Sequence, residues 1–172
     1  IECHLSLILG IISFQEKKYD LSVEYIKKAL KINPEQSEAN NNLGIALKNS
    51  GKLLKSFNVF QDALKIDPNH HLSNFNLGDL YVKFNEIEKA TNCFKKTINS
   101  KPDFSLAYST YLFFINYSDR YDSNFYYNEA LGYSKSIKRL DKNSLIPFKY
   151  NKSTTKLIVG FVSGDLKRHS IG

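Results

Sequence analysis

Apolar and polar positions alternate along the first hundred residues with the period of an α-helix. Apolar side chains recur three or four positions apart, as at Leu43 and Leu47 or at Leu77 and Tyr81, and this spacing places them on one helical face. Three Leu-Gly pairs and three prolines recur at one constant interval: Leu9-Gly10, Leu43-Gly44, Leu77-Gly78, Pro34, Pro68 and Pro102. An interval that does not vary predicts an array of one repeated helical unit.

The recurring residue types have steric roles in such a unit. Glycine and small residues such as Ser56 and Ala90 let two antiparallel helices approach closely, while Leu and Phe side chains fill the space between them. The prolines end the second helix of each unit, because proline lacks an amide hydrogen and restricts the residue before it. The pattern therefore predicts pairs of closely packed helices.

This pattern, in its interval as well as its residue types, resembles the tetratricopeptide repeat. That repeat is a helix-turn-helix of about 34 residues with the signature W-x2-L-G-x2-Y, then A-x3-F, then P. The second and third units carry these matching residues: Leu43, Gly44, Ser56, Phe60, Ala63 and Pro68, then Leu77, Gly78, Tyr81, Ala90, Phe94 and Pro102. The first unit is weaker but in register. The resemblance implies an all-α superhelix of helical hairpins, with units at residues 3–36, 37–70 and 71–104 within residues 1–104.

The repeat weakens after residue 104. Leu112 and Ser136 stand where the next glycine and proline would fall. We expect one helix at residues 105–117 and a second from about 125 to 139, which together form a degenerate capping unit at residues 105–139. Pro147 and the polar run at 151–155 predict a linker over residues 140–155.

The pattern changes again past residue 155. Residues 157–162 form a continuous apolar run, which is typical of a strand buried on both faces of a parallel sheet. Ser163, Gly164 and Asp165 predict a turn directly behind it. Because such a strand needs neighbours, we expect residues 156–172 to begin a doubly wound domain that continues beyond Gly172. The absence of methionine and of a signal peptide also suggests a piece of a longer protein.

A second resemblance rests on these last residues. The stretch LIVGFVSGDLKRHSIG at 157–172 resembles the opening of the catalytic region of the protein O-GlcNAc transferase and SPINDLY family, glycosyltransferase family 41. Its signature runs roughly L-R-V-G-Y-V-S-x-D-F-x-x-H-x-V-G, and Leu166 replaces the usual phenylalanine. The resemblance implies a two-domain GT-B (Rossmann-like) fold of which only the first strand is present.

The same resemblance implies a catalytic role for His169, in positioning or proton handling as a Ser or Thr hydroxyl attacks the anomeric carbon. Ser163, Gly164 and Asp165 would form a turn near the nucleotide sugar, where doubly wound folds place their ligands. A capping or solvated histidine remains the alternative for His169. The second nucleotide-binding lobe of the family does not lie in these residues, so we expect the chain alone to be inactive.

Asn42 and Asn76 lie two residues before their glycines, at the sixth position of the unit. A primary amide can donate to a peptide backbone and accept from it at once, which suits binding of extended segments with little demand on sequence. The resemblance implies an asparagine ladder that binds protein substrates in the concave groove, although abundant asparagine could place these two residues there by composition alone.

Composition and charge narrow the classes of partner. Of the net charge of +7, none lies in residues 1–134, which carry fifteen basic and fifteen acidic side chains. A neutral array argues against nucleic acid. The apolar stretch at residues 5–14 is too short to cross a bilayer, and we expect it to form the first core helix. Cys3 and Cys93 lack metal-ligand spacing, so we expect no metal, no cofactor and a reducing, cytoplasmic setting.

Two hypotheses from different classes follow. The first is the amino-terminal part of a protein O-glycosyltransferase that transfers GlcNAc from UDP-GlcNAc to Ser or Thr, with the array binding protein substrates. Whether the donor carries GlcNAc or fucose stays open. The second is a tetratricopeptide adaptor that binds partner proteins and performs no chemistry.

Overall fold

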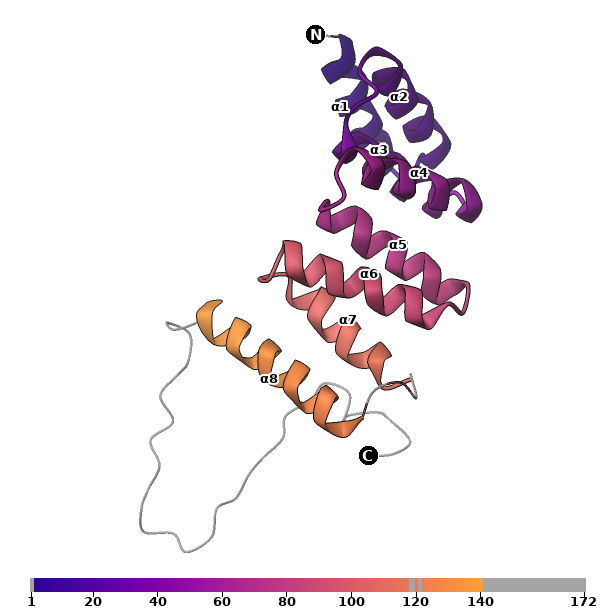
Figure 1. The fold of residues 1–172 in the computed structure, drawn as a ribbon. Helices are drawn as coiled ribbons and strands as arrows, with labels where there is room; N and C mark the ends of the chain where they lie inside the picture. Colours follow the sequence, from indigo (N-terminus) through magenta and orange to yellow (C-terminus); the bar gives the residue numbers. More distant parts are fainter. Residues whose placement is uncertain (1, 118–119, 121, 141–172) are drawn as a thin grey trace, which may run out of the picture. The chain divides into compact units, whose positions relative to one another are not determined.

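The computed structural model describes residues 2–117, 120 and 122–140, and the described chain is helical throughout (Figure 1). The helices are α1 (Glu2–Gln15), α2 (Tyr19–Ile32), α3 (Ser37–Asn49), α4 (Leu53–Ile66), α5 (His71–Lys83), α6 (Ile87–Ser100), α7 (Ser105–Ile115) and α8 (Ser123–Leu140). The expected all-α fold of helical hairpins is confirmed for these residues. The expected linker at 140–155 and strand within 156–172 lie outside the described residues, apart from the last residue of α8.

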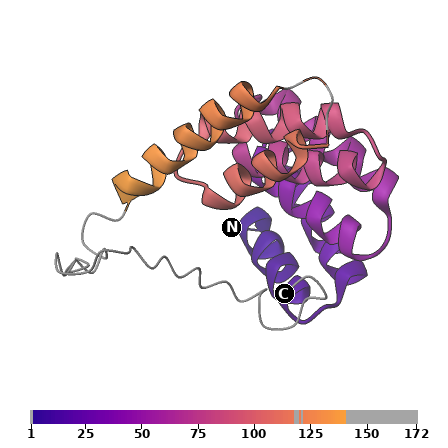
Figure 2. The ribbon, with the colours of Figure 1, turned by 90° about the horizontal axis from the view of Figure 1, so that it is seen from below.

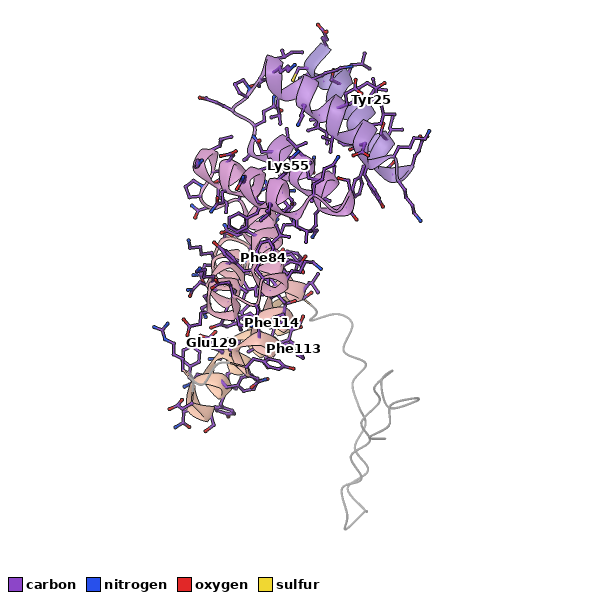
Figure 3. The ribbon with its side chains drawn as sticks, turned by 90° about the vertical axis from the view of Figure 1, so that its right-hand side faces the viewer. Tyr25, Lys55, Phe84, Phe113, Phe114 and Glu129 are labelled. Carbon is purple, nitrogen blue, oxygen red and sulfur yellow. The ribbon has the colours of Figure 1, made fainter. Side chains whose placement is uncertain are left out.

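The helices pack as successive antiparallel pairs. α1 packs on α2, α3 on α4, and α5 on α6, and the second helix of each pair also packs on the first helix of the next. The labelled residues of Figure 3 follow this order, from Tyr25 on α2 to Phe114 on α7. Seen end-on, each pair is rotated relative to the one before it (Figure 2). α1, α3 and α5 also contact one another in turn, and we call the surface that they form the first-helix face.

A glycine in the first helix of each of the first three pairs allows the second helix to approach. A Cβ built on Gly78 would lie 2.6 Å from Cε1 of Phe94, and one on Gly44 would overlap the ring of Phe60. Phe60 and Phe94 are 0% and 1% exposed. In the first pair, Gly10 faces Ile26 in the same way, at 2.6 Å from Cγ1. The recurring glycines therefore exist to admit a large side chain of the partner helix.

The turn inside each of the first three pairs contains one residue in the left-handed conformation. These residues are Lys17, Gly51 and Asn85, with φ angles of 60°, 78° and 59°, and they are spaced by the repeat. Glycine adopts this conformation without cost and asparagine with little, whereas a side chain such as that of lysine is disfavoured there. The first turn is therefore the strained one.

Lys17→Gly is expected to raise the free energy of unfolding by about 0.5–1 kcal/mol, because the left-handed backbone is retained without the clash of a Cβ. Thermal unfolding followed by far-UV circular dichroism measures this gain. Exposed Lys52, one residue after the left-handed position of the second turn, provides the control. Lys52→Gly should give no gain, and an equal rise in both variants would contradict the argument.

The last pair differs from the others in length and in packing. α7 ends at Ile115 rather than at the expected residue 117, and α8 spans Ser123–Leu140 rather than about 125–139. α8 packs on α7 through the stacked rings of Tyr108 and Tyr133, whose centroids are 5.2 Å apart. An ion pair between Lys95 and Glu129 also joins α8 to α6, and Figure 3 labels Glu129 at this end of the stack.

The expectation that residues 5–14 form a core helix was wrong in one respect. The helix is present as α1, but Leu5 and Ile12 are 54% and 45% exposed. Their counterparts one unit later, Ala39 and Ala46, are at most 1% exposed. These two residues are covered because α3 packs on α2, the second helix of the preceding pair. Among the described residues no helix precedes α1, so the same face remains exposed there.

Candidate functional site

Asn42 and Asn76 occupy equivalent places on α3 and α5, both on the first-helix face and both partly buried. Their surroundings differ. The side-chain amide of Asn76 donates to Oδ1 of Asn41 at 3.2 Å and to the carbonyl oxygen of Leu72 at 3.0 Å. Its own Oδ1 accepts from Nζ of Lys48 at 3.2 Å. The amide of Asn76 is therefore occupied within the protein.

Lys48 closes this part of the surface. Its ammonium group also donates to Oδ2 of Asp79 at 3.0 Å and is only 21% exposed. A half-buried ion pair that also bonds a neutral amide holds its members in place. The network of Lys48, Asn76, Asp79 and Asn41 therefore joins α3 to α5 and leaves little of Asn76 for a ligand.

Asn42 has no such partners. Within the described residues its side chain makes no hydrogen bond, and it lines a small cavity between α1, α2 and α3. A partly exposed amide without an internal partner can bond to the main chain of a ligand without first breaking an internal hydrogen bond. Of the two predicted asparagines, the structure leaves Asn42 available and engages Asn76.

The cavity beside Asn42 has a volume of about 90 Å³ and a mainly apolar lining: Ile11 and Phe14 of α1, Ser22 and Ile26 of α2, and Asn42 and Ile45 of α3. Since α2 packs against both α1 and α3, its side chains form the floor and the cavity opens between α1 and α3. It therefore lies on the first-helix face.

Two serines at equivalent positions show how the first pair differs from the second. Both are fully buried. Ser56 donates to the carbonyl oxygen of Gly44 at 2.7 Å, whereas the hydroxyl of Ser22 has no hydrogen-bond partner. The first pair lacks the interhelical hydrogen bond that joins the second.

Ser56→Ala is therefore expected to lower the free energy of unfolding by about 1–2 kcal/mol, because a buried hydrogen bond between α3 and α4 is lost. Ser22→Ala removes a hydroxyl that is buried without a partner, so its effect should be neutral or stabilising. Urea unfolding of the two variants measures the difference. Equal losses in both would contradict the assignment of Ser22 as unpaired.

Glu38, His70 and Ser73 resemble a catalytic triad in outline. Nε2 of His70 lies 2.9 Å from Oε2 of Glu38, and Nδ1 lies 2.8 Å from Oγ of Ser73. However, Ser73 is fully buried, so no substrate reaches its hydroxyl, and Nδ1 accepts from the Ser73 backbone amide at the start of α5. The ring caps α5 and joins it to α3.

The other chemical candidates offer little in the described part of the chain. Burial raises the pKa of the Cys93 thiol to about 11, so this cysteine is a core residue and not a nucleophile. The described residues contain no group of side chains fit to hold a metal ion. None of the helices described has the length and apolar character needed to cross a bilayer. His169, Ser163, Gly164 and Asp165 lie outside the described residues.

Sequence reasoning missed the cavity and the network around Lys48. The signal for the cavity was present, because Ile26 stands where the next two units have Phe60 and Phe94. The network had a weaker signal, since Lys48 and Asp79 lie in different repeat units and each has other possible partners.

The tetratricopeptide repeat pattern matches residues 5–36, 25–56 and 72–104. These regions cover the Leu-Gly pairs, and the chain contains tetratricopeptide repeats. No curated protein sequence matches the chain.

Solved structures share the fold. A mutant O-GlcNAc transferase from Thermobaculum terrenum has 22% identity and a TM-score of 0.66, and the match covers 78% of this chain but 26% of that one. The first TPR of Spaghetti bound to an HSP90 peptide has 14% identity and a TM-score of 0.64, over 67% and 91% of the two chains. YrrB, described as a TPR protein with an unusual peptide-binding site, has 27% identity and a TM-score of 0.59, over 64% and 57%.

Proposed function

We propose that the tetratricopeptide array binds extended segments of partner proteins on its first-helix face, with the amide of Asn42 bonding to the main chain of the segment. The observation that carries this proposal is the free, partly exposed amide of Asn42 beside an apolar cavity. A main-chain contact of this kind gives affinity without demanding a particular sequence. Repeat proteins that bind peptides, as the Spaghetti structure does, support it.

The test is binding to an array of unstructured twelve-residue peptides of mixed sequence, measured by fluorescence. Asn42→Ala is expected to raise the dissociation constants of bound peptides about five- to tenfold, which corresponds to the loss of one or two hydrogen bonds. Asn58→Ala, on the exposed side of α4, is the matched control and should bind as the parent does. Equal weakening by both variants, or none by Asn42→Ala, would reject the role of Asn42.

Asn76→Ala should act differently. Because Asn76 bonds to Asn41 and Lys48, its loss is expected to reduce the stability of the array more than its affinity for peptides. The two asparagines thus differ in their hydrogen bonds, and in this proposal Asn76 supports the surface while Asn42 binds the segment.

We further propose that the array belongs to a protein O-glycosyltransferase and delivers Ser- or Thr-containing segments to a catalytic domain that uses UDP-GlcNAc. Support comes from the sequence order of the array, the degenerate capping unit at residues 105–139 and the motif at residues 157–172. The chain spans about a quarter of the O-GlcNAc transferase that shares its fold. The donor sugar remains GlcNAc or fucose in this proposal.

The experiment is a transfer assay with the complete protein from the coding sequence that includes these residues. Mass spectrometry should detect an N-acetylhexosamine on Ser or Thr of an acceptor protein when UDP-GlcNAc is the donor, and a deoxyhexose when GDP-fucose is the donor. His169→Ala should reduce transfer while leaving peptide binding by the array intact. Peptide binding without any transfer would favour the adaptor.

A further inference from the structure

We infer that the cavity between α1, α2 and α3 is a side-chain subsite that takes one aliphatic residue, of the size of valine or leucine, from a protein segment bound on the first-helix face. This inference rests on the proposed peptide-binding function and adds a specificity to it. It assigns the selective role to Ile11, Ile26 and Ile45, which line the cavity.

Volume and lining set the kind of side chain. A cavity of about 90 Å³ has room for the three or four carbons of an aliphatic side chain. Four of its six lining residues are apolar, and none of the six is charged. The hydroxyl of Ser22 is unpaired but buried, so it is not exposed to the interior of the cavity. A charged side chain would be desolvated there without a partner.

The next junction along the array shows why this position is hollow. Each lining residue has a counterpart at the equivalent position of the next unit, and three of the counterparts differ in ways that fill or polarise the space. Phe60 replaces Ile26 and its ring lies against Gly44. Lys48 stands in the place of Phe14 and Asp79 in the place of Ile45, and Lys48 and Asp79 form an ion pair. The cavity is thus the consequence of Ile26 and of an apolar rim.

Asn42 fixes where the bound main chain would lie. Its amide is partly exposed on the lining and makes no hydrogen bond within the described residues, whereas the unpaired hydroxyl of Ser22 is fully buried. A ligand residue that places its side chain in the cavity would bring its own peptide group to the rim, within reach of a donor and an acceptor. The two elements, an amide at the rim and an apolar hollow below it, form one subsite for an extended segment.

The test follows the δ1-methyl resonances of isoleucine by NMR during titration with N-acetyl-leucine-N-methylamide, using the whole chain. The methyl groups of Ile11, Ile26 and Ile45 should shift in a saturable manner, at millimolar concentrations. The aspartate and lysine analogues of the probe should not shift them. Shifts that are absent, or equal for all three probes, would overturn the subsite.

Two variants place residues of the next junction at the equivalent positions of this cavity. Ile26→Phe should fill the cavity and Ile45→Asp should charge its rim, and both should abolish the response of the remaining methyl groups. Ile32→Phe, at an exposed position on α2, is the control and should respond as the parent does. Because Ile45 is partly exposed, its substitution keeps the test valid if Ile26→Phe fails to fold.

A peptide pair separates this inference from the proposed function. A twelve-residue peptide that binds should lose about tenfold in affinity when its aliphatic residue is changed to alanine, in keeping with the burial of one such side chain. In Ile26→Phe the two peptides should bind equally. If peptides bind but never move the cavity methyl groups, the subsite is wrong and the binding function stands. If no peptide binds, the binding function itself is wrong.

Discussion

Phe94→Ala is expected to lower the free energy of unfolding of the array by about 3–5 kcal/mol, because it removes a fully buried ring from the contact between the two helices of the third pair. Phe94 is 1% exposed and lies against Gly78. Its ring also packs on Phe75 and Phe114, with centroids 5.5 and 6.0 Å away. The substitution thus leaves a cavity that reaches three helices.

Phe113→Ala is the matched control for this loss. Phe113 is 55% exposed and lies next to Phe114 on α7 (Figure 3). Its removal should cost less than about 1 kcal/mol, since it forfeits little buried area. Chemical unfolding followed by circular dichroism, with amide exchange to locate the change, measures both. Similar losses in the two variants would mean that the described packing around Phe94 is wrong.

Gly44→Ala and Gly132→Ala are expected to change stability in opposite directions. Alanine at position 44 would overlap the ring of Phe60, which is completely buried, so a loss of about 1–3 kcal/mol is expected. At position 132 of α8 the nearest atom to an added Cβ is Oη of Tyr108 at 3.6 Å. Alanine there should stabilise by up to about 1 kcal/mol, through helix propensity.

Thermal unfolding of the two variants under one set of conditions provides the comparison. If both alanines stabilise, then Gly44 is not needed for the approach of α4, and the steric reading of the repeated glycines fails. If both destabilise, then α8 is packed more closely than the structure shows.

The sequence predicted those parts of the fold that depend on local and repeated signals. Helix pairs followed from the period, and the close approach of the paired helices at Gly44 and Gly78 followed from the recurrence of these glycines. Exposure of α1 could not be predicted, because its apolar side chains carry no sign of whether another helix covers them. The predicted end of α7 was two residues too late, because neither Asn116 nor Tyr117 is a residue type that breaks a helix.

The candidate site was predicted only in outline. The position of Asn42 and Asn76 on the first helices followed from the repeat, but their different surroundings did not. Asn76 is engaged because Lys48 and Asn41 come within hydrogen-bonding distance when α3 packs beside α5. Such a distinction depends on side-chain geometry between units, which the pattern of residue types along the sequence does not contain.

The most direct test of the central claim is to map a bound segment onto the array by amide chemical shifts. A peptide that binds the chain should perturb the amides of α1, α3 and α5, with the largest changes around Asn42, and leave the exposed sides of α4 and α6 unchanged. Perturbations concentrated on α4 and α6, with α3 unaffected, would contradict the account.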